Sequence, residues 1–349
     1  MPRRAWGIAA AALGLGLAVL AAGLTLAGYD AGAALTALWS GAFGSWYAFT
    51  STTLVRAVPL ILIGLGIALG FRAGVFNIGA EGQFYAGAIA ATWVGLHVAA
   101  LPAAVAIPAV WCAALLVGAL WVAAPVGLRM RYGVLEVIST LLLNFIAEAL
   151  VSYVVQGPLQ ERQGIYPQSD QIALSARLPL VPGTRLHVGL FLALGCAGVL
   201  WYLFARARWG FMLRAVGAGA RAAEVSGRID SRRVTAQALL ASGAIAGLAG
   251  GVEVSGVSYA LYQNLSPGYG FTAIAVALLA RLHPAGVVGA GLLFGALEAG
   301  AGAMQRDAGV PAVAVSVVEA VVLIVVVVAA AGVRRPGALH APGFRRRAA

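Results

Sequence analysis

One long apolar run that ends in a polar segment decides the fold. Residues 54–83 read LVRAVPLILIGLGIALGFRAGVFNIGAEGQ. The first part, residues 54–70, is nearly long enough to cross the hydrocarbon core of a membrane, which takes about 20 residues in a helix. The second part, residues 70–83, adds four glycines, one asparagine, one glutamate and one glutamine. Because irregular backbone at membrane depth is tolerated only where protein or a water-filled cavity covers it, this segment is expected inside a bundle of membrane helices.

The whole chain has the composition of a membrane protein. Of its 349 residues, 61% are hydrophobic and 10% are charged, whereas soluble globular chains are about 45–50% apolar and about 25% charged. A water-soluble protein of this length could not hide so much apolar surface in one core. We therefore expect an all-α polytopic membrane protein with the lipid bilayer as its solvent.

Hydrophobic runs predict about ten transmembrane helices in a single domain, residues 1–333, followed by a short basic cytoplasmic tail, residues 334–349. The first run is longer than the apolar core of about 7–15 residues in a signal peptide, so a retained span is expected. Residues 29–53 are rich in Trp and Tyr, which suits a membrane interface. The run at 268–282 is short, and it is either a half-helix or is extended by the residues before it. The ten runs lie at about 8–28, 54–70, 77–100, 102–127, 134–155, 187–205, 234–256, 268–282, 285–304 and 310–333.

The distribution of arginine supports this topology. With the N-terminus inside and ten alternating spans, eighteen arginines fall inside and five outside. The cytoplasmic loops of membrane proteins carry more basic residues than the outside loops, so this distribution agrees with the assumed topology. We therefore expect both termini in the cytoplasm and a multi-pass protein of the inner (plasma) membrane. The five outside arginines are Arg56, Arg162, Arg177, Arg185 and Arg306.

The sequence contains no motif for catalysis or metal binding. All 23 basic residues are arginine, so a phosphate-binding Walker loop is excluded and any ATP must be hydrolysed by another subunit. Cys112 and Cys196 lie in apolar runs and are expected to be packing residues, and the four histidines show no metal-ligand spacing. The net charge of +11 lies in short segments between apolar runs, which indicates topology and not nucleic-acid binding. We expect no cofactor, no metal ion and no enzymatic activity in this chain.

Polar residues recur at every fourth position in the run at 134–155. They are Glu136, Thr140, Asn144, Glu148 and Ser152. Four residues turn a helix by about 400°, so the row drifts by only about 40° per step and forms one stripe. Glu148 is expected at mid-to-outer depth, where an ionised carboxylate usually faces the bundle interior or a pore. The stripe is therefore either a polar wall of a translocation path or a set of helix–helix hydrogen bonds.

Other polar residues also fall within the apolar runs. If the helix after residue 76 begins at Asn77, then Asn77 and Glu81 share one face at i, i+4 spacing. Glu253, Glu298 and Glu319 lie within or near spans, and the sequence alone assigns them neither partners nor roles.

Three separate stretches resemble one known family. They are FNIGAEGQ at residues 76–83, GFMLRAVG at 210–217 with AAEVSGRID at 222–230, and GYGFTAIAVALLAR at 268–281. They resemble permease subunits of ATP-binding-cassette importers of the nucleoside and simple-sugar type, in the superfamily that includes ribose and branched-chain amino acid permeases.

The resemblance runs from about residue 54 to residue 333. It departs from the family's pattern at Ala218-Gly219, where relatives often carry Asn-Pro, and at Ala280, where glycine is usual. The first departure puts the local turn geometry in question more than the role of the segment.

The resemblance implies a permease that carries out no covalent step. It would pair with a second, related permease chain, with two cytoplasmic ATPase subunits and with an extracytoplasmic substrate-binding lipoprotein. Residues 206–233 would be the cytoplasmic coupling loop, in which a short helix sits in a cleft of the ATPase and Gly210, Gly217 and Gly227 permit tight turns. The alternative is a loop that serves only topology. On the outside, residues 156–186 are either a docking surface for the binding protein or a simple connecting loop.

The candidate functional residues come from these segments. Candidates for the translocation path are Asn77, Glu81, Gln83, Asn144 and Glu148. Candidates for coupling to the ATPase are Arg214, Gly217, Ala223, Glu224 and Gly227.

Nucleosides are the expected substrates, because the first and last stretches resemble the nucleoside branch more than the ribose branch. Simple sugars are the alternative. An ion-coupled secondary transporter that uses intramembrane carboxylates and a passive channel are rivals from other classes. An intramembrane enzyme comes last, since no nucleophile–base pair or metal set is visible.

Overall fold

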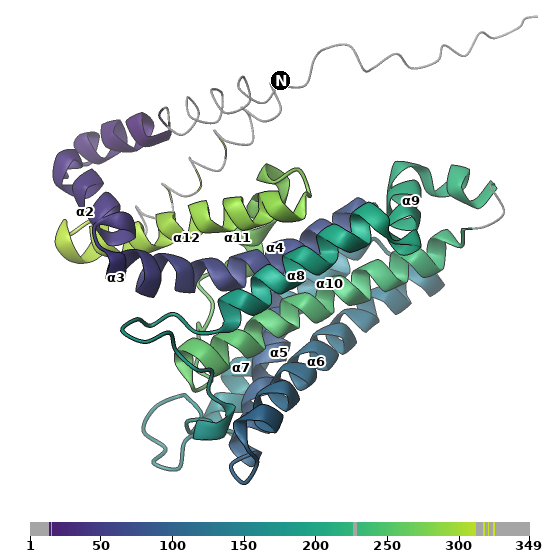
Figure 1. The fold of residues 1–349 in the computed structure, drawn as a ribbon, viewed down its shortest axis with the longest axis horizontal. Helices are drawn as coiled ribbons and strands as arrows, with labels where there is room; N and C mark the ends of the chain where they lie inside the picture. Colours follow the sequence, from purple (N-terminus) through teal and green to yellow (C-terminus); the bar gives the residue numbers. More distant parts are fainter. Residues whose placement is uncertain are drawn as a thin grey trace, which may run out of the picture. The chain divides into compact units, whose positions relative to one another are not determined.

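Figure 1 shows the computed structural model, which describes residue 14, residues 16–225 and 229–311, and residues 317, 320 and 324. Every regular element of this part of the chain is a helix, which confirms the predicted all-α class. The helices that follow the first one are α2 (Ala31–Phe43), α3 (Trp46–Ala48), η1 (Phe49–Thr53), α4 (Leu54–Arg72), α5 (Ala80–His97), α6 (Ala103–Tyr132), α7 (Glu136–Gln156), η2 (Leu174–Ala176), α8 (Gly189–Arg206), α9 (Arg208–Val225), α10 (Ser231–Glu253), η3 (Val254–Ser258), α11 (Tyr269–Leu279) and α12 (Pro284–Asp307).

The chain forms two compact units. One consists of Met1–Thr36 with Met304–Ala349, and it contains the short apolar helix Gly16–Leu26. The other is Ala37–Ala303, which holds the features described below. A single domain over residues 1–333 with a basic tail after it stays a prediction.

Six helices of the described residues are long and apolar enough to cross a membrane. α5 and α11 coincide with the expected spans at 77–100 and 268–282 but are not among the six, and α11 has only 11 residues. The last expected span, 310–333, lies almost wholly outside the described residues. The count of ten spans and the cytoplasmic position of both termini therefore stay predictions. The six helices are Trp46–Arg72, Ala103–Tyr132, Glu136–Gln156, Gly189–Arg206, Ser231–Ser258 and Pro284–Asp307.

The helix that leads into α4 begins at Trp46, well before the expected start near residue 54. The threonines in between can be buried in this helix because their hydroxyls donate to backbone carbonyls. Thr50 donates to the carbonyl of Trp46 at 2.7 Å, and Thr53 donates to that of Ala42 at 2.9 Å. This part contains the π-helical turn η1, and a second π-helical turn, η3, ends α10. Single π-turns within α-helices are frequent at functional sites.

α10 lies at the centre of the larger unit. It packs against α4, α5, α6 and α9, and Figure 1 shows it running along α5 and α6. Its glycines allow backbone contact on two sides, because a Cβ atom at Gly250 would lie 2.0 Å from the carbonyl oxygen of Phe84 in α5. A Cβ atom at Gly247 would lie 2.4 Å from the carbonyl oxygen of Ala114 in α6. Small residues at such positions let membrane helices pack closely.

The bundle has two chemically different ends. α8 begins directly after residues 157–188 and ends at Arg206, where the arginine-rich segment starts, and α10 runs back in the opposite direction. We call the end that carries residues 157–188 the loop end, and the end that carries residues 206–233 the arginine end. The bias in arginine predicts that the arginine end faces the cytoplasm.

The first break in the bundle is the non-helical segment of residues 73–79, between α4 and α5. α5 starts at Ala80, so the condition under which Asn77 and Glu81 would share a helix face, a helix that begins at Asn77, is not met. The Asn77 side chain accepts the backbone N–H of Gly79 at 3.1 Å. Such local bonding favours a turn over a helix.

The second break is residues 259–268, between η3 and α11. Its backbone is irregular, with positive φ angles of 56° at Tyr259 and 58° at Asn264. The chain returns into the bundle here, because α11 starts against the first turn of α5. A Cβ atom at Gly270 would lie 2.3 Å from the backbone nitrogen of Glu81. α11 is therefore a half-helix, and the two breaks meet in the interior.

Candidate functional site

Buried amide side chains hold the first break in place. Asn77 Nδ2 donates to Gln83 Oε1 at 2.8 Å and to Ser242 Oγ at 2.9 Å, and Gln83 Nε2 donates back to Asn77 Oδ1 at 2.9 Å. Asn77 and Gln83 are at most 1% exposed. Since buried amides need such partners, and Ser242 belongs to α10, this cluster holds the first break against α10. A role for Asn77 and Gln83 on the translocation path stays a prediction.

The first half of the polar stripe on α7 forms hydrogen bonds with the first break and with the start of α5. Thr140 Oγ1 accepts the backbone N–H of Ile78 at 3.3 Å. One turn earlier in α7, Glu136 Oε1 accepts the backbone N–H of Phe76 at 3.2 Å. Asn144 accepts the N–H of Gly82 at 2.8 Å and donates to the carbonyl of Ile78 at 2.9 Å. This half of the stripe therefore forms hydrogen bonds between helices, which was the second of the two alternatives for the stripe. A path role for Asn144 stays a prediction.

Glu81 caps the half-helix α11. Its Oε2 accepts the backbone N–H of Gly270 at 2.5 Å, and the residue is 2% exposed. Ser266 Oγ accepts the N–H groups of Gly268 and Tyr269 at 3.0 and 2.9 Å. A helix N-terminus has unpaired N–H groups and a partial positive charge, so it stabilises a carboxylate. Glu81 therefore ties the two breaks together.

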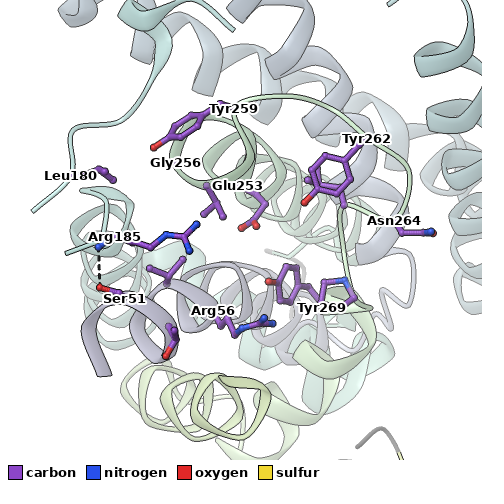
Figure 2. A pocket seen from close by; sticks show the side chains of 15 residues that line it. Ser51, Arg56, Leu180, Arg185, Glu253, Gly256, Tyr259, Tyr262, Asn264 and Tyr269 are labelled. Carbon is purple, nitrogen blue, oxygen red and sulfur yellow. Dashed lines mark hydrogen bonds between the residues drawn. The ribbon is translucent and has the colours of Figure 1, made fainter. Parts of the chain in front are cut away.

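A cavity of about 490 Å³ lies at the loop end, lined by the start of α4, the end of α10 and the second break. Both π-turns contribute to its wall. The volume is within the range of about 300–1,000 Å³ that is usual for small-molecule sites. Figure 2 shows the cavity with its labelled side chains, of which Arg56, Glu253, Tyr259, Tyr262 and Tyr269 carry most of its polar and aromatic character.

The charged groups of the cavity are not equivalent. Arg56 Nη1 lies 3.6 Å from Glu298 Oε2, so this guanidinium is paired with a carboxylate of α12. Arg185 is exposed at the rim, where its backbone N–H donates to Ser51 Oγ at 3.0 Å. Glu253 is 6% exposed and its carboxylate points into the cavity in Figure 2.

The three tyrosine rings also differ in their surroundings. Arg177 lies over the ring of Tyr259, 4.8 Å from its centroid. The ring of Tyr269 packs edge-on against Phe84 with centroids 6.0 Å apart. Tyr262 is 38% exposed, and among the described residues its ring has no aromatic or cationic partner. Tyr262 is therefore the ring best placed to stack on a bound molecule.

Glu148 lines a second, smaller cavity of about 210 Å³, together with Tyr85, Ser152 and Gln263. Gln263 Nε2 donates to Ser152 Oγ at 2.6 Å, and Asn264 borders both cavities. Glu148 is exposed on a helix long enough to cross a membrane. Because a carboxylate is costly against lipid, this face of α7 is expected to meet water or another chain. The geometry supports the path alternative for Glu148, which stays a prediction.

The segment at the loop end has a fastened part and an exposed tip. Residues 168–188 are bonded to the bundle, for example where Ser169 N–H donates to the carbonyl of Leu261 at 2.8 Å and Leu261 N–H donates to Ser169 Oγ at 2.9 Å. Residues 157–167 are mostly exposed, with Ile165 and Tyr166 exposed by 66% and 61%. The tip is the part that a partner can reach.

Glu161 orders this tip. Its carboxylate accepts the side-chain N–H of Gln168 at 2.7 Å and the backbone N–H of Tyr166 at 2.9 Å. The Gln168 hydrogen bond and then the Tyr166 hydrogen bond lower the pKa of Glu161 below its ordinary value of 4.5. Ionised Glu161 therefore stabilises the shape of the tip.

α9 at the arginine end is kinked at Gly219, where the backbone is extended. Gly210 and Gly217 lie inside the helix, so the prediction that they form turns is wrong. They are close-contact positions instead, because a Cβ atom at Gly217 would lie 2.1 Å from the carbonyl oxygen of Arg72 at the end of α4. Gly227 lies outside the described residues.

The other coupling candidates connect α9 to its neighbours. Arg214 donates to the carbonyl of Phe204 in α8, and Glu224 accepts the hydroxyl of Ser231 at the start of α10. Ala223 is buried. A role for Arg214, Ala223 and Glu224 in coupling stays a prediction.

The cavity itself was not predicted, although the sequence contains a signal for it. Asn77-Ile followed by Phe84 recurs as Asn264-Leu followed by Phe271 at the same spacing. Both strings lie at a break that leads into a helix. Matching interrupted segments in the two halves of a transporter mark a binding site.

Comparison with known proteins gives consistent matches over most of the chain. A family model described as "Branched-chain amino acid transport system / permease component" matches residues 49–329. A glucose ABC transporter permease protein of Haloferax volcanii is 40% identical over 282 residues, which are 78% of this chain and 74% of that protein. A guanosine ABC transporter permease protein of Bacillus subtilis is 37% identical over 293 residues, 83% of either chain.

A nucleoside ABC transporter permease protein of Lactococcus lactis subsp. cremoris is 34% identical over 283 residues, 78% of this chain and 77% of that protein. No solved structure matches the chain. The family match includes both breaks, the cavity and α9, in agreement with the resemblance found in the sequence. The chain is thus an integral membrane protein, and it belongs to the family of branched-chain amino acid transport system permease components.

Proposed function

We propose that the chain is the permease subunit of an ATP-driven importer of nucleosides. The observation that carries this proposal is the cavity at the loop end, where three tyrosines and several hydrogen-bonding side chains surround about 490 Å³. A nucleoside joins a flat aromatic base to a sugar rich in hydroxyl groups, and this lining offers a partner for each part. The guanosine and nucleoside permeases at 37% and 34% identity support this substrate class.

The translocation path is proposed to follow the face of α7 that carries Glu148, between this chain and a second permease. The second break brings Gln263 and Asn264 to the same face, and Asn264 also borders the cavity. A solute leaving the cavity therefore meets polar side chains first. The pairing with a second permease explains how a carboxylate on the outside of a span is kept from lipid.

Energy is proposed to enter at the arginine end, through α9. Gly217 packs on the backbone of Arg72, next to the first break, and Trp209 Nε1 donates to Gln237 of α10 at 3.1 Å. An ATPase subunit that displaces α9 would thus move the ends of α4 and α10 together. These are the two helices whose other ends line the cavity.

The extracytoplasmic binding protein is proposed to dock on the tip, residues 157–167. The tip carries the exposed side chains of Ile165 and Tyr166, while residues 168–188 hold it to the helices around the cavity. Docking there would place a released solute beside the cavity mouth.

The test is uptake of labelled guanosine by proteoliposomes that contain the whole transporter, assembled with and without this chain. We expect ATP-dependent accumulation of guanosine only when the chain is present. Accumulation of guanosine without ATP by vesicles holding this chain alone would indicate an ion-coupled transporter instead. Co-purification of an ATPase with the chain separates the same alternatives.

A simple-sugar importer is the second candidate, and the glucose permease of Haloferax volcanii at 40% identity favours it. The same vesicles are therefore assayed with labelled glucose. Loss of glucose uptake without the chain, with guanosine never transported, replaces the nucleoside assignment.

A further inference from the structure

Among the described residues, one carboxylate of the cavity has no partner. Glu253 is the last residue of α10 before η3 and is 6% exposed. Among the residues that the structure describes, none forms a hydrogen bond or ion pair with its side-chain oxygens. Arg56 lines the same cavity, but the ion pair of Arg56 is with Glu298, at 3.6 Å.

The other buried acidic residues of the described chain differ from Glu253 in this respect. Glu81 and Glu136 each accept a backbone N–H, and Glu298 pairs with Arg56. Burying a carboxylate without hydrogen bonds destabilises a fold. The partner that satisfies Glu253 is therefore expected to come from outside the chain, through the cavity into which it points.

We propose that Glu253 binds a pair of neighbouring hydroxyl groups on the transported solute, the 2′- and 3′-hydroxyls of a ribose. This inference rests on the proposed function. An ionised carboxylate only accepts hydrogen bonds and has two oxygens, so its complement is a pair of donors. Hydroxyl groups give carboxylates short, charge-assisted bonds, and an acidic side chain binds ribose in the same way in dinucleotide sites.

The charges of the cavity select an uncharged donor. Arg56 and Arg185 line the same cavity as Glu253, so a cationic ligand would meet two like charges. An anionic ligand would meet the carboxylate of Glu253. A neutral solute with several hydroxyl groups avoids both costs, and with its sugar at Glu253 its base can reach the exposed ring of Tyr262 in the same cavity.

The experiment compares uptake of guanosine and 2′-deoxyguanosine by the whole transporter in proteoliposomes, with the unchanged chain and with Glu253→Gln. The amide keeps the size of the side chain but removes the charge and one acceptor oxygen. Because every arm contains the same binding protein, any change in the preference between the two nucleosides arises in this chain. We expect the guanosine-to-deoxyguanosine ratio to fall about tenfold in the variant, as for the loss of one charge-assisted hydrogen bond.

The matched control is Asp307→Asn, which neutralises an exposed carboxylate that does not line the cavity. It should leave the ratio unchanged. An unchanged ratio in Glu253→Gln, or an equal fall for both nucleosides, overturns the inference. If the unchanged transporter takes up no nucleoside, the proposed function has failed. The comparison of glucose with 2-deoxyglucose then tests hydroxyl binding by Glu253 separately.

A second measurement needs no variant. The complex of permease and ATPase without the binding protein is heated with guanosine, 2′-deoxyguanosine or 3′-deoxyguanosine. We expect guanosine to raise the unfolding temperature more than either deoxy compound does. Equal stabilisation by all three contradicts a role for the hydroxyl pair, even if the Glu253→Gln variant fails to fold.

Discussion

Tyr262 has the most exposed ring of the three tyrosines in the cavity, at 38%. We predict that Tyr262→Ala lowers nucleoside uptake about tenfold, because stacking of a base on an aromatic side chain contributes about 1–3 kcal/mol. Tyr262→Phe keeps the ring and should retain most of the uptake. The measurement is the initial rate of guanosine uptake at low concentration. Equal losses in both variants would mean that the hydroxyl, and not the ring, is what the solute needs.

Glu161 gives the tip at the loop end a dependence on pH. Its pKa is lowered in the fold by the hydrogen bonds from Gln168 and Tyr166, so its stabilising effect is complete above about pH 4.5. The effect is lost as the pH falls through the lower pKa of the folded state. We predict faster hydrogen exchange of residues 157–168 as the pH is lowered through this range, after correction for intrinsic rates. Glu161→Gln should remove that extra dependence, and a persistent dependence would assign it to another group.

The polar residues inside the spans show how far single residues can be predicted. Asn77, Glu81 and Gln83 are conspicuous in the sequence because polar groups at membrane depth must be covered. Their partners were not predictable, since Ser242 lies 165 residues from Asn77 and Gly270 lies 189 residues from Glu81. Only the fold shows that these side chains hold two breaks in place, and that Glu253 has no such partner among the described residues.

At the scale of elements, α9 is the link between the arginine end and the first break. We predict that Gly217→Val abolishes ATP-driven uptake while the chain still inserts into the membrane, because any Cβ atom at this position meets the carbonyl of Arg72 at 2.1 Å. The matched control is Gly195→Val in α8, where a Cβ atom meets nothing within 4 Å. Uptake and membrane insertion are measured for both. Normal uptake by Gly217→Val would show that α9 does not transmit the motion.

The long helices could be predicted from the sequence and the interrupted ones only in part. Runs of about 20 apolar residues specify α6, α7, α8, α10 and α12 by hydrophobicity alone. The start of α5 was misplaced because the bonding of Asn77 to Gly79 competes with the helix. The half-helix α11 was one of two alternatives, since its length depends on where Glu81 and Ser266 cap it.

At the scale of the molecule, the predicted orientation is open to direct labelling. In a chain whose Cys112 and Cys196 are replaced by alanine, we predict that Gln163→Cys in the tip reacts with a membrane-impermeant maleimide on intact cells. Arg221→Cys in α9 should react only after permeabilisation. The physical reason is the excess of arginine at the end that carries α9. Reaction of Arg221→Cys on intact cells would reverse the topology.

The all-helical class was predictable from the sequence but the internal arrangement was not, and the direction of the chain in the membrane stays a prediction. Composition and arginine bias indicate a membrane bundle with two different ends. The meeting of the two breaks and the cavity beside them depend on contacts between residues far apart in the chain, such as Gly270 on Glu81. In the sequence, this arrangement is indicated only by the recurring strings at Asn77 and Asn264, one at each break.

The cap that Glu81 forms on α11 also bears on which solutes can bind at this helix end. In several carriers built from broken helices, the exposed amino end of a half-helix is where an incoming carboxylate is caught. Here Glu81 already fills that position through its bond to Gly270. An amino acid would have to displace this carboxylate before its own could bind there, so we expect the amino end of α11 not to serve as a carboxylate site in this chain.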